Sequence, residues 1–307
     1  MKRKYMSEFA LNTYSSYLTI CYPNDLDTLN QEINYHIYMI TLIPRLTFER
    51  DSLQIFEDHI CLKIKVKTEL KDTIETIEFG LAPDLNHKDL LYEIDKASKT
   101  LSILTKEGET IKIRVLNLYL SFTDQFLETE ILYIGQSFGK NGERTALDRL
   151  RSHSTLQKIQ SDLLFEREDR DLTLLLLEFT PRLLSSFDGR SKDYERSLDD
   201  DTIHLKSIME NPPLRLNNQI INITEAALIY YFKPEYNDKF KNNFPDVEHK
   251  GYKQYYDLDY NAICVELDPE AINLKLYSKE RRYYPFRSIR YSLHPDKVRK
   301  SMFDIFS

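Results

Sequence analysis

The sequence predicts an α+β protein, from two strand patterns and one helix pattern. Between residues 60 and 67, apolar residues alternate with mostly basic ones, which is typical of a half-buried strand. The short, almost continuously apolar run at 172–179 is interpreted as a buried strand. A helical pattern begins near Asn222 and ends at Lys233-Pro234, because proline disfavours helical geometry in the residue before it.

The first 112 residues are expected to form a β-rich region that serves as a possible recognition module. Beyond the strand at 60–67, the same reasoning predicts strands at 33–43, 73–79, 101–104 and 111–122, a short helix at 87–97, and a turn at 106–109. The spacing of residues in this region does not indicate any chemistry.

The second region, 113–240, changes character and is expected to hold the chemistry, with an insertion at about 181–221. A strand ending at 131–135 is followed by a polar loop at 136–144 and by a helix from about residue 145. The last region, 241–307, is predicted to be a β segment with strands at 262–267 and 271–277.

Composition excludes several classes of protein. The chain has 307 residues and a formal net charge of −7, which argues against coating of nucleic acid through a global positive field. Its three cysteines are far apart and have neither metal-ligand spacing nor the even number of a disulfide framework. With no signal-peptide or membrane-spanning run, we expect a cytoplasmic protein without a membrane partner.

A local basic stretch near the C-terminus can still bind nucleic acid, because cations for phosphates alternate there with aromatic faces for stacking. The alternative is a solvated hairpin face whose tyrosines pack inward, and the sequence favours neither. The cations expected to contact nucleic acid are Arg151, Lys279, Arg281, Arg282, Arg287 and Arg290.

Four local features with chemical potential follow one another in the second region. A Tyr-Ile-Gly tripeptide ends a strand, an Arg and a His four residues apart share a face of the next helix, a Glu opens a later helix, and an Asn follows that helix. These residues are Tyr133 to Gly135, Arg149, His153, Glu225 and Asn237.

This ordered set resembles the GIY-YIG nuclease superfamily over about residues 113–240. The resemblance implies a small antiparallel sheet flanked by helices and a metal-dependent endonuclease activity. We favour DNA over RNA as the nucleic acid, although the sequence does not decide between them. The resemblance also implies that Glu225 binds Mg²⁺ or Mn²⁺, that Arg149 contacts the phosphate, and that Asn237 braces the site. Tyr133 would orient or deprotonate the attacking water, and His153 would relay the proton.

The family's first tripeptide should lie on the preceding strand. The best match there is Asn117-Leu118-Tyr119, which keeps only the tyrosine, and the resemblance gives Tyr119 the role of a phenolate base. Because this match is degenerate, a binding module that has lost turnover is an alternative function.

Two further alternatives remain open. With Asn222 as the N-cap, Glu225 would occupy the third helical position and cap backbone N–H groups instead of holding a metal. The net negative charge also fits a protein-interaction scaffold. With any of these functions, the chain could bind another protein or a second copy of itself.

Overall fold

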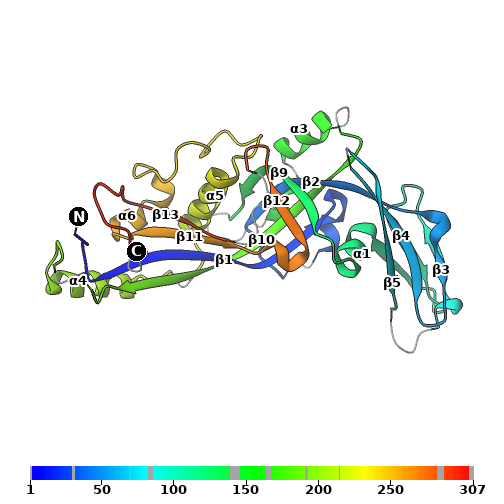
Figure 1. The fold of residues 1–307 in the computed structure, drawn as a ribbon, viewed down its shortest axis with the longest axis horizontal. Coiled ribbons are helices and arrows are strands. Elements are labelled where there is room, and N and C mark those ends of the chain that lie inside the picture. The colour runs from blue at the N-terminus through cyan, green and yellow to red at the C-terminus, as the bar shows by residue number, and fades with distance from the viewer. Residues whose placement is uncertain are drawn as a thin grey trace.

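The protein is mixed α+β, with one long curled sheet, one small antiparallel sheet and helices packed on the long sheet (Figure 1). The computed structural model describes residues 2–29, 32–68, 70–81, 86–138, 146–151, 153–163, 167–190, 193–213, 215–281 and 287–303, with residue 287 described by its backbone alone.

The long sheet has ten strands among the described residues. Seven of them lie side by side in the order β12 (Leu274–Tyr277), β9 (Leu127–Gln136), β2 (Ile37–Phe48), β10 (Arg170–Phe187), β1 (Ser7–Cys21), β11 (Ala262–Leu267) and β13 (Arg287–Ser292). The pairs β12–β9 and β1–β11 are parallel, and the other neighbours in this order are antiparallel.

The centre of this sheet is buried on both faces, which explains why β2 and β10 are apolar at consecutive positions. Alternate residues of β10, such as Leu174 and Leu175, belong to two different apolar clusters. The cluster on one face includes α2 (Ala146–Leu150) and α3 (Ser154–Leu163), and the cluster on the other face includes α5 (Asn218–Phe232). The sheet therefore lies between two layers of helix.

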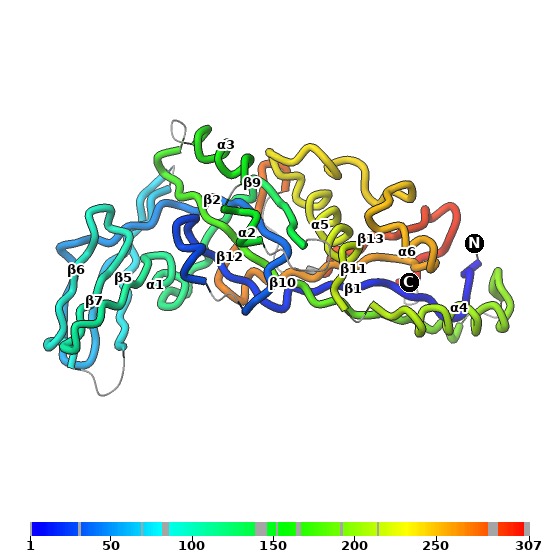
Figure 2. Tube along the Cα trace, turned by 180° about the vertical axis from the view of Figure 1, so that it is seen from behind, coloured from blue at the N-terminus to red at the C-terminus, as the bar shows by residue number. Residues whose placement is uncertain are grey.

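An arm leaves the sheet between β2 and β9 and occupies one end of the elongated molecule (Figures 1 and 2). The end of β2 pairs with β4, which pairs in turn with β3 and β5. The elements of the arm, in chain order, are η2 (Arg50–Ser52), β3 (Gln54–Ile55), β4 (Ile60–Lys67), β5 (Thr73–Phe79), η3 (His87–Asp89), β6 (Leu91–Ile94), β7 (Thr100–Leu104), β8 (Thr110–Arg114) and α1 (Val115–Phe122). Strands β6, β7 and β8 form the small antiparallel sheet.

The strands expected at 60–67, 73–79 and 101–104 are confirmed, but two other predictions in the arm are wrong. Residues 87–97 hold a 3₁₀ turn and β6 instead of a helix. The strand expected at 111–122 ends at Arg114, and the rest is helix α1. That apolar run fits either structure locally, and burial of its Val115, Leu116 and Leu118 against the core favours the helix.

The remaining elements lie at the far end of the molecule or connect the layers. Both chain termini and helix α4 (Leu198–Glu210) lie at the end of the molecule opposite the arm (Figure 1). The expected insertion at 181–221 consists of the end of β10, helix α4 and the start of α5. The elements of the chain not yet named are η1 (Pro23–Thr28), η4 (Lys250–Tyr252), α6 (Gln254–Asp257) and η5 (Pro269–Ile272).

The long sheet crosses both region boundaries expected at residues 112 and 240. Strands β1 and β2 come from the first region, β9 and β10 from the second, and β11 to β13 from the third. The three segments therefore share one sheet. Within the described residues, no helix is both long enough and apolar enough to cross a membrane.

Candidate active site

Two tyrosines face each other from neighbouring strands at one end of β2 and β9. The register pairs Tyr38 with Gly135 and Ile40 with Tyr133, and the two phenol rings lie 6.2 Å apart between centroids. A Cβ atom on Gly135 would lie 2.6 Å from the Tyr38 hydroxyl and 2.7 Å from the Tyr133 ring. Only glycine lets both rings occupy this place, which gives the Tyr-Ile-Gly tripeptide a steric reason.

His153 contacts both rings and has a defined tautomer. Its Nδ1 accepts a hydrogen bond from the backbone N–H of Leu156 at 3.1 Å, so Nδ1 carries no proton. Its Nε2 therefore carries the proton and donates a hydrogen bond to the Tyr38 hydroxyl oxygen, 2.9 Å away. Burial and, to a smaller extent, the charge of Arg149 lower the pKa of His153, which favours this neutral form.

The guanidinium of Arg149 faces both phenol groups. Burial raises the pKa of Tyr38 and of Tyr133, and the charge and hydrogen bonding of Arg149 oppose this effect at each. The expectation that Arg149 and His153 share one helix is wrong, because α2 ends at Leu150 and His153 precedes α3. Both side chains nevertheless reach the tyrosines.

The hydrogen bond of His153 reaches the hydroxyl of Tyr38, whose ring lies beside that of Tyr133. The Tyr38 oxygen accepts from His153, and the neighbouring Tyr38 hydroxyl partly offsets the effect of burial on the pKa of Tyr133. Tyr38 is fully buried, whereas Tyr133 is partly exposed. Tyr133 is thus the phenol that a ligand can contact, and the buried Tyr38 hydroxyl lies beside it.

Glu225 lies inside α5 and not at its start. The N-cap is Asn217, whose side chain accepts from the N–H of Ile220, so Glu225 lies in the third turn and the capping interpretation is wrong. Burial raises the pKa of Glu225 to about 7, against the charges of Arg149 and Lys239. The carboxylate in turn raises the pKa of both tyrosines, which places it beside them.

One carboxylate without a partner fits a hydrated divalent cation. No residue in the described part of the chain makes a hydrogen bond or an ion pair to Glu225, and no group of three or more His, Cys, Asp or Glu side chains there has metal-ligand geometry. Mg²⁺ prefers oxygen ligands and keeps several waters, with the substrate phosphate supplying further oxygens. Glu225 is the residue that would hold it.

Asn237 connects the segment after α5 to β9. Its Oδ1 accepts from the N–H of Ile134 and its Nδ2 donates to the Ile134 carbonyl, both at 2.8 Å. Strand β12 covers this edge of β9 only as far as Glu130, so the Asn237 side chain pairs backbone groups that the sheet leaves open. The Asn237 side chain thus holds the segment after α5 against β9.

Tyr119 lies apart from these residues, and its assignment to the site is wrong. It is buried in α1 against the arm, where burial raises its pKa to about 12 and its nearest charged influence is Glu75 of β5. The tyrosine that lies beside Tyr133 on the neighbouring strand is Tyr38, in the sequence His36-Ile37-Tyr38. The sequence feature that could have identified Tyr38 is an Ile-Tyr pair at the start of an apolar strand. The arm, residues 49–126, separates this pair from Tyr133 along the chain.

The cations expected to bind nucleic acid do not form one surface in the described part of the chain. Arg151 lies beside η1, Lys279 pairs with a residue that follows α5, and Arg290 lies on β13. Four of the cations have protein contacts: Arg151 with Asp27 at 2.8 Å, Lys279 with Glu235 at 2.6 Å, Arg281 over the Tyr231 ring at 5.5 Å, and Arg290 over the Phe303 ring at 4.8 Å.

Some of the predicted basic stretch lies outside the described residues, namely Arg282 and the side chain of Arg287. Arg290 is exposed on β13, with its guanidinium 4.8 Å from the ring centre of Phe303. Tyr291 packs inward, and its hydroxyl donates to the carbonyl of Ala227 in α5. For this tyrosine, the inward-packing alternative is correct.

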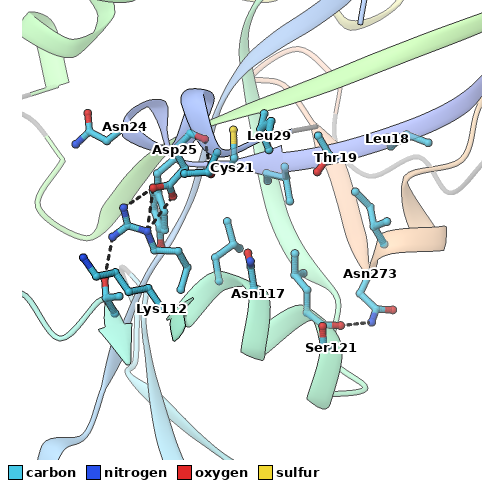
Figure 3. A pocket seen from close by; sticks show the side chains of 18 of the residues that line it. Leu18, Thr19, Cys21, Asn24, Asp25, Leu29, Lys112, Asn117, Ser121 and Asn273 are labelled. Carbon is cyan, nitrogen blue, oxygen red and sulfur yellow. Dashed lines mark hydrogen bonds and ion pairs between the residues drawn. The ribbon is translucent and has the colours of Figure 1, made fainter. Parts of the chain in front are cut away.

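A separate cavity of about 880 Å³ lies between the end of β1, the small sheet, α1 and η5 (Figure 3). Its wall includes the ion pair of Arg114 with Asp25, and Asn117, Ser121 and Asn273 point toward it. None of the residues around Tyr133 lines it, so it is not part of the candidate active site.

Comparison of the chain with protein-family models, with curated proteins and with solved structures gives no match. The interpretation of the site therefore depends on its own geometry and on the motif resemblance.

Proposed function

We propose that the protein is a metal-dependent nuclease whose active site is of the GIY-YIG type. The observation that carries the proposal is the convergence of two tyrosines, an arginine, a histidine and a carboxylate from five separate segments of the chain. The position of Tyr38 on the strand beside β9 also supports it. The lack of a Gly-Ile before Tyr119, which motivated an inactive binding module, does not concern this site.

Hydrolysis of a phosphodiester needs a base for the attacking water. In the proposed reaction Tyr133 first loses its proton to solvent. Burial and the charge of Glu225 raise the pKa of Tyr133, and the guanidinium of Arg149, the neighbouring Tyr38 hydroxyl and a cation bound at Glu225 would offset this and stabilise the phenolate. The water oxygen forms the new bond to phosphorus, the bond from phosphorus to the leaving oxygen breaks, and the proton of the water passes to Tyr133. The leaving oxygen takes a proton from solvent.

The other side chains stabilise charge. Arg149 offers a planar fork of donors that matches phosphate oxygens. When bound at Glu225, Mg²⁺ or Mn²⁺ supplies positive charge that offsets the negative charge on the phosphate oxygens. His153 is a donor to Tyr38 in this scheme and not a proton relay, because accepting a proton at Nδ1 would break its hydrogen bond from Leu156.

Cleavage assays on supercoiled plasmid, single-stranded DNA and RNA, each with Mg²⁺ or Mn²⁺, test the proposal. We expect Tyr133→Phe and Glu225→Gln to abolish cutting. Tyr38→Phe removes one hydrogen bond to a charged group and should slow cutting about 10- to 100-fold, from about 1.5 to 3 kcal/mol. Tyr119→Phe is the matched control and should cut like the unmutated protein.

Unchanged cutting by Glu225→Gln would contradict the proposed function. Equal effects of Tyr38→Phe and Tyr119→Phe would show that the pair of facing tyrosines is not the reactive centre. DNA is the expected substrate, and the same assay compares it directly with RNA.

A further inference from the structure

The segment that follows α5 is held against β9 and brings a lysine near the candidate active site. Helix α5 ends at Phe232, and Lys233 turns the chain with a left-handed backbone at φ 48°. The chain then crosses β9, where the backbone N–H of Tyr236 donates to the Leu132 carbonyl at 3.0 Å and Asn237 pairs with Ile134. Lys239 follows two residues later, so its backbone is held close to the site.

The backbone on the other side of Lys239 is also constrained. Phe240 adopts a left-handed conformation with φ 65°, and its ring packs edge-on against His249 at 5.0 Å between centroids. Lys239 thus lies between the pairing of Asn237 with β9 and an anchored aromatic ring. The backbone position of Lys239 beside the site is therefore fixed on both sides.

The charge of Lys239 is not used within the described part of the chain. Its side chain is exposed and makes no ion pair or hydrogen bond with a described residue. By contrast, Lys241 donates to the Glu235 carbonyl at 3.2 Å, and Lys279 pairs with the Glu235 carboxylate. Lys239 is nevertheless close enough to Glu225 to lower the pKa of that carboxyl, as Arg149 also does.

We propose that Lys239 is a second phosphate-binding cation of this site, which contacts a phosphate oxygen of the nucleic-acid strand beside Glu225. The inference deepens the proposed function and rests on it. Arg149 comes from α2, and Lys239 comes from the segment after α5. A strand bound at Glu225 would therefore meet cations from two separate segments of the chain, which helps to fix its position across the site.

The alternative is that Lys239 acts only as a counter-charge for Glu225. The two ideas differ in salt dependence, because a contact with a phosphate releases a counterion and a contact with a protein carboxylate does not. The binding constant falls as the salt concentration rises, and removal of one phosphate contact makes the plot of log K against log salt concentration less steep by about 1. The slope thus separates a residue that binds the strand from one that only acts on Glu225.

The test measures binding of a labelled 20-nucleotide single strand and a duplex of the same sequence by full-length protein carrying Glu225→Gln, which prevents cutting. Into this background go Lys239→Ala, Lys239→Arg and, as the control from the same segment, Lys241→Ala. We expect Lys239→Ala to weaken binding at low salt and to lower the slope by about 1. Lys239→Arg should keep the slope, and Lys241→Ala should match the background protein.

Cleavage by the same three substitutions in the otherwise unmutated protein completes the experiment. We expect Lys239→Ala to lower kcat/KM by about tenfold or more, as expected when a charge-assisted phosphate contact is lost, with recovery in Lys239→Arg. Thermal melts check that each variant is folded.

The outcomes separate this inference from the proposed function. If the protein cuts nucleic acid and Lys239→Ala matches Lys241→Ala in both slope and kcat/KM, the role of Lys239 is overturned and the nuclease stands. If nothing is cut but Lys239→Ala still lowers the slope, hydrolysis is overturned and the phosphate contact stands. Absence of binding to either oligonucleotide at low salt would overturn the role of Lys239.

Discussion

Replacement of Glu225 by glutamine should stabilise the metal-free protein above neutral pH. Burial raises the pKa of this carboxyl from 4.5 to about 7, so the folded protein binds its proton more tightly than the unfolded chain does. Stability therefore falls as the pH rises from 4.5 to 7. At about 1.36 kcal/mol per pH unit, the full difference corresponds to about 3 kcal/mol.

Because the Glu225 side chain is partly exposed, we expect about 2 kcal/mol of this difference to be realised. Glutamine has a similar shape and no charge. Glu225→Gln should match the unmutated protein near pH 4.5 and exceed its free energy of unfolding by about 2 kcal/mol at pH 8.

Urea unfolding with EDTA at pH 4.5, 6, 7 and 8 measures this difference. Glu248→Gln, at an exposed position, is the matched control and should change stability by less than about 0.5 kcal/mol at every pH. Mn²⁺ at pH 8 should stabilise the unmutated protein but not Glu225→Gln, since a ligand stabilises only the form that binds it. Equal stability of Glu225→Gln and the unmutated protein at pH 8 would refute the reasoning.

Three further predictions concern the geometry around the tyrosines. Gly135→Ala should lower the free energy of unfolding by about 1 to 3 kcal/mol and impair cutting, because its Cβ would collide with both phenol rings, whereas Gly189→Ala, with no atom within 4 Å of its Cβ, should be neutral in thermal melts. Asn237→Ala should lower the free energy of unfolding by about 2 to 4 kcal/mol and speed hydrogen exchange at the Ile134 amide, because two backbone groups lose their hydrogen-bond partners. An unchanged exchange rate would contradict the pairing of Asn237 with Ile134. Nitrogen NMR of His153 should show a proton on Nε2 and none on Nδ1 at pH 7, and the opposite tautomer would reverse the direction of hydrogen bonding toward the tyrosines.

Much of the site is local in sequence and could be predicted from it. The tripeptide Tyr133-Ile-Gly135, the helix that ends before Pro234 and the asparagine after it can each be recognised from a few neighbouring residues. Strands such as β4, β5 and β11 were also predictable, because the alternation of apolar and polar residues reports directly which face is buried. Each of these features is therefore visible in a short stretch of the sequence.

Other features depend on which segments meet in space. Tyr38 enters the site because β2 pairs with β9 across the whole arm, and strand pairing at such a separation leaves no local signal. Tyr119 was the nearer tyrosine, but tertiary packing turned its apolar segment into helix α1 and buried it elsewhere. Local pattern also placed the N-cap of α5 at Asn222, whereas the helix begins earlier, with Asn217 as its N-cap.

The sequence by itself determined the mixed α+β class and the chemical character of Tyr133, Arg149, Glu225 and Asn237, because composition and short-range spacing carry that information. The tertiary structure decided which second tyrosine faces Tyr133, that Glu225 has no partner in the described part of the chain, and that Lys239 lies near it. The physical reason is that burial, charge environment and strand neighbours are properties of the packed chain.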